Sequence, residues 1–284
     1  MPPEVVDAIS RLEGQSFVRE VEWFAELPST NDYALARGAE RALPLPRLIW
    51  AERQTAGRGR GDHTWWSSSG ALTFSLLIDG PALGLPPASW PQLSMVSAIA
   101  VADALQQFLP EDRIALKWPN DVHVLCASGG DGSSAASGGT ADSDRQPVSR
   151  KICGILVEPV TGVPGRLVIG IGLNVRNSLH SASAELRSQA VSLVELLPQP
   201  PTLPLMLCAL LQAWVRAAQD LAAGRMDLAA RWSRQCLLRQ REVQWSLWER
   251  TATGICRGIN PQGALVIERE GRLETYWGGT VRLL

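Results

Sequence analysis

The sequence has few cysteines and histidines, the residues that cross-link small secreted domains or bind metal ions. Its 284 residues include five cysteines and three histidines, which lie scattered without a C-x-x-C pair. An odd number of isolated cysteines is typical of reduced thiols in a protein core and excludes a disulfide framework. Structural zinc sites need close pairs of cysteine or histidine. We therefore expect no metal ion held by protein ligands alone.

Long apolar runs and an excess of one charge are also missing. No apolar run reaches the ~20 residues that a membrane-spanning helix needs, and the net charge is −1. A chain without a basic surplus has no general field that attracts nucleic acid. Residues 1–10 carry acids and no apolar core of a signal peptide. These absences predict a cytoplasmic protein that binds neither DNA nor a membrane.

Glycine and arginine alternate in one short stretch, at Gly57, Arg58, Gly59 and Arg60, after an apolar strand-like run and before paired tryptophans. Glycine lets the backbone approach a ligand and turn its N–H groups inward. Arginine offers planar forks of donors that suit carboxylate and phosphate oxygens. The composition predicts a loop that holds an anion. A solvated basic turn between two strands is the alternative.

A second polar stretch, residues 117–121, joins two short apolar strands around Pro119. A lysine inside an apolar strand costs free energy on burial unless it has an anionic partner. Lys117 is therefore expected either to contact an anionic ligand, which we favour, or to form an ion pair with Asp121.

Three small polar residues, Ser29, Thr30 and Asn31, stand at the start of a short predicted helix that ends near Gly38. Ser29 or Thr30 is expected to be the N-cap. Consecutive hydroxyl and amide side chains also form a pocket rich in donors, so both roles are compatible.

The rest of the chain alternates predicted strands and helices. Apolar runs without alternation indicate strands covered on both faces, and apolar residues at helical spacing indicate helices. The predicted strands are 47–53, 71–78, 150–158 and 166–175, and the predicted helices are 90–108, 203–223 and 226–236. Gly170 and Gly172 interrupt the last of these strands, which often marks a close approach of backbone or ligand. Four short strands between 243 and 277 suggest a small barrel.

Together these stretches resemble the biotin–protein ligases. The motifs that carry the resemblance are Ser29-Thr30-Asn31, the glycine–arginine loop at 54–65, Lys-Trp-Pro-Asn-Asp at 117–121, Lys-x-x-Gly-Ile-Leu-x-Glu at 151–158, Gly-x-Gly-x-Asn at 170–174 and the tail at 257–279. The resemblance covers residues 23–284. It implies an α+β fold with two parts. One is the mixed-sheet catalytic core of the biotin/lipoate ligases, which resembles the class II synthetases, and the other is a small SH3-like β-barrel domain. The implied parts are a short extension at 1–20, a catalytic domain at 21–236 with a flexible insertion at 127–149, and the SH3-like domain at 237–284.

The resemblance also implies an activity. An enzyme of this family converts biotin and Mg-ATP to biotinyl-5′-adenylate and then transfers biotin to a lysine of the biotin carboxyl carrier protein of acetyl-CoA carboxylase or a related carboxylase. The implied ligands are thus biotin, ATP and Mg²⁺. A repressor with an N-terminal DNA-binding domain is not expected, because the N-terminal segment is short. A lipoate ligase or octanoyltransferase, which lacks the glycine–arginine loop, and a biotin-binding module without activity are the alternatives; monomer and homodimer stay open.

Roles for individual residues follow from their positions in the motifs. The implied biotin-binding residues are Ser29, Thr30, Asn31, Gln54, Gly57, Arg58, Gly59, Arg60, Lys151 and Gly154. The implied ATP-binding residues are Arg60, Trp65, Lys117, Asn120, Asp121 and Asn174. Lys151, Arg58 and Arg60 are the implied catalytic residues, and Asp121 would hold Mg²⁺ through ATP. The loop departs from the family at Gly61, Asp62 and His63, where many members have arginine, glycine and arginine, so the retention of the adenylate is expected to differ here.

Overall fold

The computed structural model describes residues 3, 5–7, 9, 17–127 and 147–284. The predicted extension at 1–20 and the predicted insertion at 127–149 lie largely outside these residues. Within the described part of the chain, no helix is both long and apolar enough to cross a membrane.

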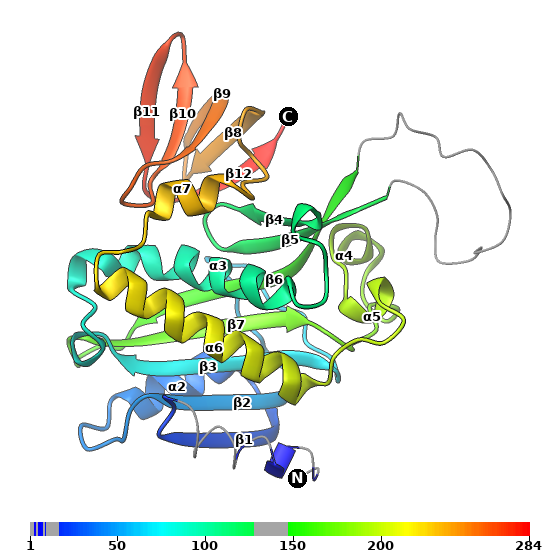
Figure 1. The fold of residues 1–284 in the computed structure, drawn as a ribbon, viewed down its shortest axis with the longest axis vertical. Helices are drawn as coiled ribbons and strands as arrows, with labels where there is room; N and C mark the ends of the chain where they lie inside the picture. Colours follow the sequence, from blue (N-terminus) through cyan, green and yellow to red (C-terminus); the bar gives the residue numbers. More distant parts are fainter. Residues whose placement is uncertain (1–2, 4, 8, 10–16, 128–146) are drawn as a thin grey trace, which may run out of the picture.

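A seven-stranded sheet forms the centre of the molecule, in the order β1-β2-β3-β7-β6-β5-β4 (Figure 1). Its strands are β1 (Glu20–Leu27), β2 (Arg47–Gln54), β3 (Ala71–Asp79), β4 (Ile114–Lys117), β5 (Asp121–Cys126), β6 (Val148–Pro159) and β7 (Arg166–Asn174). β1 and β2 pair in parallel, and every other neighbouring pair is antiparallel. The predicted mixed sheet is confirmed.

Helices cover both faces of this sheet. α3 (Leu93–Leu105) and α6 (Leu203–Ala222) pack together on one face, and α2 (Thr30–Gly38) contacts β2, β3 and β7. Leu72 and Phe74 of β3 belong to the core cluster that includes α3 and α6, whereas Leu77 belongs to the cluster that includes Ala34 of α2. Because successive side chains of a strand point to opposite faces, the two clusters lie on opposite sides of the sheet.

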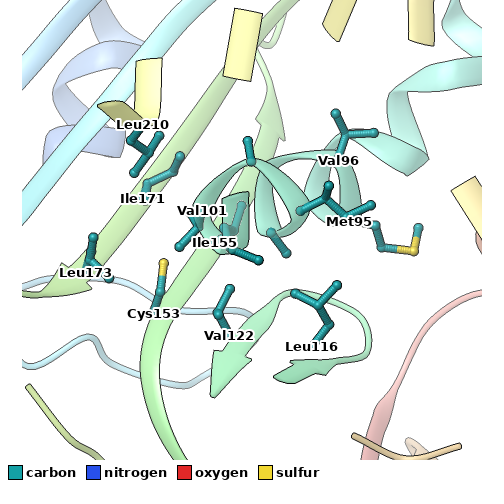
Figure 2. Close-up of a cluster of buried hydrophobic side chains, with 14 of the residues drawn as sticks. Met95, Val96, Val101, Leu116, Val122, Cys153, Ile155, Ile171, Leu173 and Leu210 are labelled. Carbon is teal, nitrogen blue, oxygen red and sulfur yellow. The ribbon is translucent and has the colours of Figure 1, made fainter. Parts of the chain in front are cut away.

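The larger core lies between α3 and the strands. Figure 2 shows side chains of α3 facing those of β4, β5, β6 and β7, together with Leu210 of α6. The labelled members are Met95, Val96, Val101, Leu116, Val122, Cys153, Ile155, Ile171, Leu173 and Leu210. This face of the sheet is thus packed against α3 and α6.

The predicted helix at 90–108 is shorter than expected. A 3₁₀ segment, η2 (Pro87–Gln92), precedes α3, and α3 ends at Leu105. Pro87 and Pro91 lack the N–H groups that would continue an α-helical ladder toward the N-terminus. The apolar spacing alone did not indicate this break.

The chain ends in a second sheet of five antiparallel strands, in the order β11-β10-β9-β8-β12. The strands are β8 (Glu242–Leu247), β9 (Arg250–Ile259), β10 (Leu265–Arg269), β11 (Arg272–Tyr276) and β12 (Thr280–Leu283). This sheet agrees with the predicted small β domain, although the sequence analysis did not find β12. The indole Nε1 of Trp118 donates to the carbonyl of Gly263 at 3.0 Å and joins the C-terminal strands to the part of the chain that carries the seven-stranded sheet.

The remaining elements are short: η1 (Pro81–Leu83), η3 (Glu111–Arg113), α4 (Ala184–Gln189), α5 (Leu193–Leu196) and α7 (Leu228–Ser233). α4 and α5 were not predicted from the sequence. The segment that contains α4 pairs with β6, since the N–H of Val191 donates to the carbonyl of Lys151 at 3.0 Å. It thereby forms one side of the cavity described next.

Candidate active site

A cavity of about 1020 Å³ is bordered by α2, β5, β6, β7 and the glycine–arginine stretch. Nearly all of the residues implied by the family resemblance line it: Ser29, Thr30, Asn31, Gln54, Arg58, Gly59, Arg60, Trp65, Lys117, Asn120, Asp121, Lys151, Gly154 and Asn174. Gly57 is not among the lining residues. It lies behind them, where a Cβ atom would approach the carbonyl oxygen of Trp65 to 2.5 Å.

Strand glycines form a floor without side chains beneath this cavity. A Cβ atom on Gly170 would lie 2.0 Å from Oδ1 of Asn31, and one on Gly172 would lie 2.4 Å from the indole of Trp65. A Cβ atom on a third glycine, Gly154, would lie 3.2 Å from Nζ of Lys151 and 3.4 Å from the Trp65 ring. The strand glycines predicted a close approach of backbone or ligand; the structure shows instead a close approach of the side chains of Asn31 from α2 and Trp65 from the loop.

The polar residues at the start of α2 form a connected hydrogen-bond network. Ser29 is the N-cap, and its hydroxyl accepts from the N–H of Asp32. The backbone N–H and the hydroxyl of Thr30 both donate to Oε1 of Gln54, at 2.7 and 3.0 Å. The buried hydroxyl of Ser75 lies 2.8 Å from Oγ1 of Thr30 and 2.6 Å from Oδ1 of Asn31, and its one proton can serve only one of these acceptors at a time.

The glycine–arginine loop is a β-hairpin, residues 57–65. Arg58 bridges Thr64, the N–H of Gly59 donates to the carbonyl of His63 at 2.7 Å, and the N–H of Trp65 donates to the carbonyl of Gly57 at 2.9 Å. The turn of the hairpin is therefore made of residues 60–63, with Gly61 at a φ of 58°. The three positions that depart from the family lie in this turn.

The two arginines of the hairpin point to different partners. Nε of Arg58 lies 2.7 Å from Oδ1 of Asp32, and Nη2 lies 2.5 Å from Oε2 of Glu158. Nη1 of Arg60 donates to the carbonyl of Gly279 in the C-terminal sheet at 3.3 Å. Burial lowers the pKa of Arg60, and the nearby carboxylate of Asp121 opposes this shift. Arg60 is thus a desolvated cation at the cavity, whereas Arg58 is bound by carboxylates at its edge.

Two lysines and one aspartate meet on β4, β5 and β6. Nζ of Lys151 lies 2.7 Å from Oδ1 of Asp121, and Asp121 is the cross-strand neighbour of Lys117. Burial lowers the pKa of Lys117; the charge of Asp121 opposes this and the charge of Lys151 adds to it. The close ion pair is therefore Lys151–Asp121, and not the Lys117–Asp121 pair that the sequence left open. His123, buried on β5 beside these groups, has its pKa lowered to about 4, mainly by burial.

The side chains of Asn120 and Asn174 are bonded to the protein itself. Nδ2 of Asn120 donates to the carbonyl of Ile155 at 2.7 Å. Nδ2 of Asn174 donates to the carbonyl of Val191 at 3.1 Å, and its Oδ1 accepts from Asn177 at 3.0 Å. Both amides hold loops against the central strands, and their predicted contacts with ATP stay predictions.

Some lining residues were not singled out in the sequence. They come from the segment around α4, from β5 and from the start of β12: Leu179, Ser183, Leu186, Ala190, His123, Thr280 and Val281. Ser75 and Glu158, which bond the lining residues, were also missed as site residues. A serine inside the apolar strand β3 is the one signal that could have drawn notice to Ser75, because an unpartnered buried hydroxyl is costly.

Comparison with known proteins identifies the family to which this chain is similar. The sequence profile of the Biotin/lipoate A/B protein ligase family matches residues 23–174. The chain is 31% identical over 293 residues to the bifunctional ligase/repressor BirA of Salmonella typhimurium, in an alignment that covers 99% of this chain and 79% of that protein. The chain belongs to the biotin/lipoate A/B protein ligase family. This ligase chain is also 29% identical over 266 residues to the biotin–[acetyl-CoA-carboxylase] ligase of Mycobacterium tuberculosis, covering 93% of this chain and 88% of the relative.

The ligase fold is also shared with solved structures. The biotin protein ligase from Aquifex aeolicus in complex with biotin and ATP superimposes with a TM-score of 0.74 and 22% identity, covering 94% of this chain and all of that one. At this level of identity the likeness concerns the fold, including the mixed sheet and the small C-terminal β domain.

Proposed function

We propose that this protein is a biotin–protein ligase that activates biotin with ATP and transfers it to a lysine of a biotin carboxyl carrier domain. The observation that carries the proposal is one cavity in which a polar pocket around Thr30 and Asn31 adjoins the cations Lys151, Lys117 and Arg60. The names of its relatives in Mycobacterium tuberculosis and Salmonella typhimurium support a ligase. The acceptor is accordingly the carrier protein of acetyl-CoA carboxylase or a related carboxylase.

The first step joins two anions. A carboxylate oxygen of biotin attacks the α-phosphorus of ATP, the bond to the bridging oxygen breaks, and pyrophosphate leaves. Carboxylate and triphosphate repel each other, so the reaction needs fixed positive charge and oriented donors at the point of attack. Desolvated cations provide this best, because their field is not screened by water. Arg60 and Lys117, whose pKa values burial lowers, meet this requirement.

We assign the polar pocket to the biotin head group. Its donors and acceptors come from Ser29, Thr30, Asn31 and Gln54. The last three are joined in one network through Ser75, and Ser29 caps α2. A rigid ureido ring with N–H donors and a carbonyl acceptor matches such a pocket. In this assignment Gly59 and Gly154 line the pocket, and Gly57 lies behind it against the carbonyl of Trp65.

We assign the nucleotide to the side of the cavity that Lys117, Asn120, Asp121 and Asn174 line. Trp65 offers the flat apolar face for a base or for the chain of biotin, with Nζ of Lys151 5.9 Å from its ring centroid. Lys151 then lies between the two substrates. It is placed to stabilise charge on the carboxylate and α-phosphate oxygens in both steps.

The donor set fits a magnesium ion that arrives with ATP. Within the described residues no group of three or more His, Cys, Asp or Glu side chains could hold a metal ion. Mg²⁺ commonly binds through one or two carboxylates together with substrate phosphates and water. Asp121 would hold the ion in this way, and the ion would neutralise phosphate charge.

In the second step the ε-amine of the acceptor lysine attacks the acyl carbon of biotinyl-5′-adenylate. The bond to the phosphate oxygen breaks, an amide forms, the attacking amine loses one proton to solvent, and AMP leaves with the negative charge. The ammonium of Lys151 stabilises this leaving charge without giving up its proton. The cavity must open for the acceptor, and its rim includes Thr280 of the C-terminal sheet.

The proposal is tested by incubating the protein with biotin, Mg-ATP and an apo carrier domain and measuring the mass of the carrier. We expect a mass gain that corresponds to one biotin and that requires ATP. A gain with lipoate or octanoate but not with biotin would assign the chain to the other branch of the family. No gain with any acyl group would indicate a binding module.

Replacement of the central cation gives a sharper test. We expect Lys151→Ala to reduce adenylate formation by about 10²- to 10³-fold or more, as loss of a preorganised charge does in other enzymes. The fold should persist, because Lys151 and Asp121 are both partly exposed and such a pair contributes on the order of 1 kcal/mol or less. Pyrophosphate release reports the rate and thermal unfolding reports the fold. A variant that forms adenylate at the wild-type rate would contradict the role assigned to Lys151.

A further inference from the structure

Glu158 connects three parts of the site, and the proposed reaction assigns it no role. Its Oε2 accepts from Nδ2 of Asn31 at 2.9 Å and from Nη2 of Arg58 at 2.5 Å. Asn31 stands in the first turn of α2, Arg58 in the hairpin and Glu158 near the end of β6. One carboxylate oxygen thus joins the pocket assigned to biotin, the hairpin and the central sheet.

A second carboxylate holds the same guanidinium. Nε of Arg58 is 2.7 Å from Oδ1 of Asp32, so carboxylates from α2 and β6 bracket one arginine. The side chains are 37% exposed for Arg58, 24% for Glu158 and 53% for Asp32. Charge-assisted hydrogen bonds at such partly exposed positions are weakened by water but retained, and Glu158 is the more buried of the two carboxylates.

The hairpin depends on such side-chain contacts for its position. Its base is anchored by backbone bonds, from Thr55 to Leu27 and from Ala56 to Pro28. Beyond that base, the backbone hydrogen bonds found for residues 57–65 in the described part of the chain join the hairpin only to itself. Side chains must therefore hold it against α2 and β6.

We propose that Glu158 is a positioning residue that fastens the hairpin over the cavity through Arg58, so that the latch Asp32–Arg58–Glu158 sets how long the activated intermediate is retained. The proposal rests on the proposed ligase function. An acyl-adenylate is lost whenever the hairpin opens before the acceptor arrives, so the strength of the latch enters the rate of release directly. The turn residues Gly61, Asp62 and His63 offer few cations to bind the intermediate. Retention of the intermediate therefore depends more strongly on the latch in this protein.

The test uses the full-length protein and Glu158→Gln. Glutamine keeps the shape and an acceptor oxygen for Asn31, but it removes the negative charge that faces Arg58. The enzyme is loaded with labelled biotin and Mg-ATP, separated from free ligand, and chased with excess unlabelled biotin. We expect labelled biotinyl-5′-adenylate to leave the variant about tenfold faster, the effect of losing one charge-assisted hydrogen bond. Higher salt should speed release from the wild type more than from the variant.

Glu268→Gln is the matched control. Glu268 pairs with Arg257 at 2.7 Å in the C-terminal sheet, and their side chains are 34% and 36% exposed. This pair resembles the latch in chemistry and exposure but lies outside the cavity lining. We expect wild-type release from this control.

A double variant separates the latch from a general structural role. If Glu158 acts through Arg58, adding Glu158→Gln to an Arg58→Gln protein should change the release rate by less than about twofold. Release from the single Glu158→Gln variant at the wild-type rate, or an undiminished acceleration in the Arg58→Gln background, would overturn the latch. A wild-type protein that forms no labelled adenylate would instead overturn the proposed function, and the latch with it.

Discussion

His123 is the buried group whose titration should be visible in the stability of the protein. Its side chain is 7% exposed, and neither ring nitrogen has a hydrogen-bond partner among the described residues. Burial lowers its pKa to about 4; of the charges that face it, Asp121 opposes the shift, while Lys117 and Lys151 add to it. Between pH 6.5 and about 4 the imidazole is therefore neutral in the folded protein and protonated in the unfolded chain.

The sign of the effect follows from this difference. Between pH 6.5 and about 4 the unfolded chain binds a proton that the folded protein does not bind, so stability falls as the pH falls through this window. At pH 4 the loss of stability is about 3 kcal/mol, since each pH unit within this window contributes up to about 1.4 kcal/mol. At pH 5 the same relation gives a loss of about 2 kcal/mol. Well above pH 7 the imidazole is neutral in both states, so His123 contributes almost nothing to the change of stability with pH.

The assay is urea unfolding at pH 7.5 and at pH 5.0 for the wild type and for His123→Leu. Leucine cannot titrate, and it removes two unpaired polar atoms, so the variant should be as stable as the wild type at pH 7.5, or more so. At pH 5.0 it should exceed the wild type by about 2 kcal/mol more than it does at pH 7.5. His180→Leu, at an exposed site, controls for the loss of a histidine. An equal fall in stability for wild type and His123→Leu would refute the argument.

Two further changes test the packing around the site. We expect Gly170→Ala to weaken biotin binding by at least about tenfold in calorimetry, because its Cβ would displace Asn31. Gly278→Ala is the control and should bind biotin normally, because its Cβ would meet nothing within 4 Å. We expect Trp118→Phe to cost about 1–3 kcal/mol in chemical unfolding, since the carbonyl of Gly263 loses its buried indole donor; unchanged stability would show that this bond does not hold the two sheets together.

The strands that carry the site could be predicted because they are buried on both faces. β3 and β7 read as apolar runs, and their bounds differ from the prediction by one residue or less. β1 was missed for the opposite reason: it is an edge strand whose sequence alternates with Glu20, Glu22 and Glu26. Two of these acids pair with the buried Arg47 of β2, a partner that no local pattern reveals.

The motifs also predicted which residues gather at the cavity, but not what each side chain does there. Arg58 and Glu158 are 100 residues apart in sequence and share a hydrogen bond, and Asn31 and Glu158 are 127 apart. Such contacts depend on the order of strands in the sheet, which spacing along the chain does not determine. From the sequence Arg58 and Arg60 were predicted to act as equivalent cations. In the structure Arg58 pairs with two carboxylates, whereas Arg60 lies beside the cavity.

The strand glycines and the hairpin depend on each other. A glycine inside a strand costs up to about 1 kcal/mol in chain entropy, and β7 carries two of them in an otherwise apolar strand. Gly172 leaves space that the indole of Trp65 fills, and Gly170 leaves space for Asn31. Trp65 and Asn31 are thereby placed at the sheet surface, one from the hairpin and one from α2, with Glu158 tying the hairpin to Asn31 through Arg58. The two glycines thus cost some stability, but the absence of side chains at these positions lets the hairpin and α2 approach the central strands at the site.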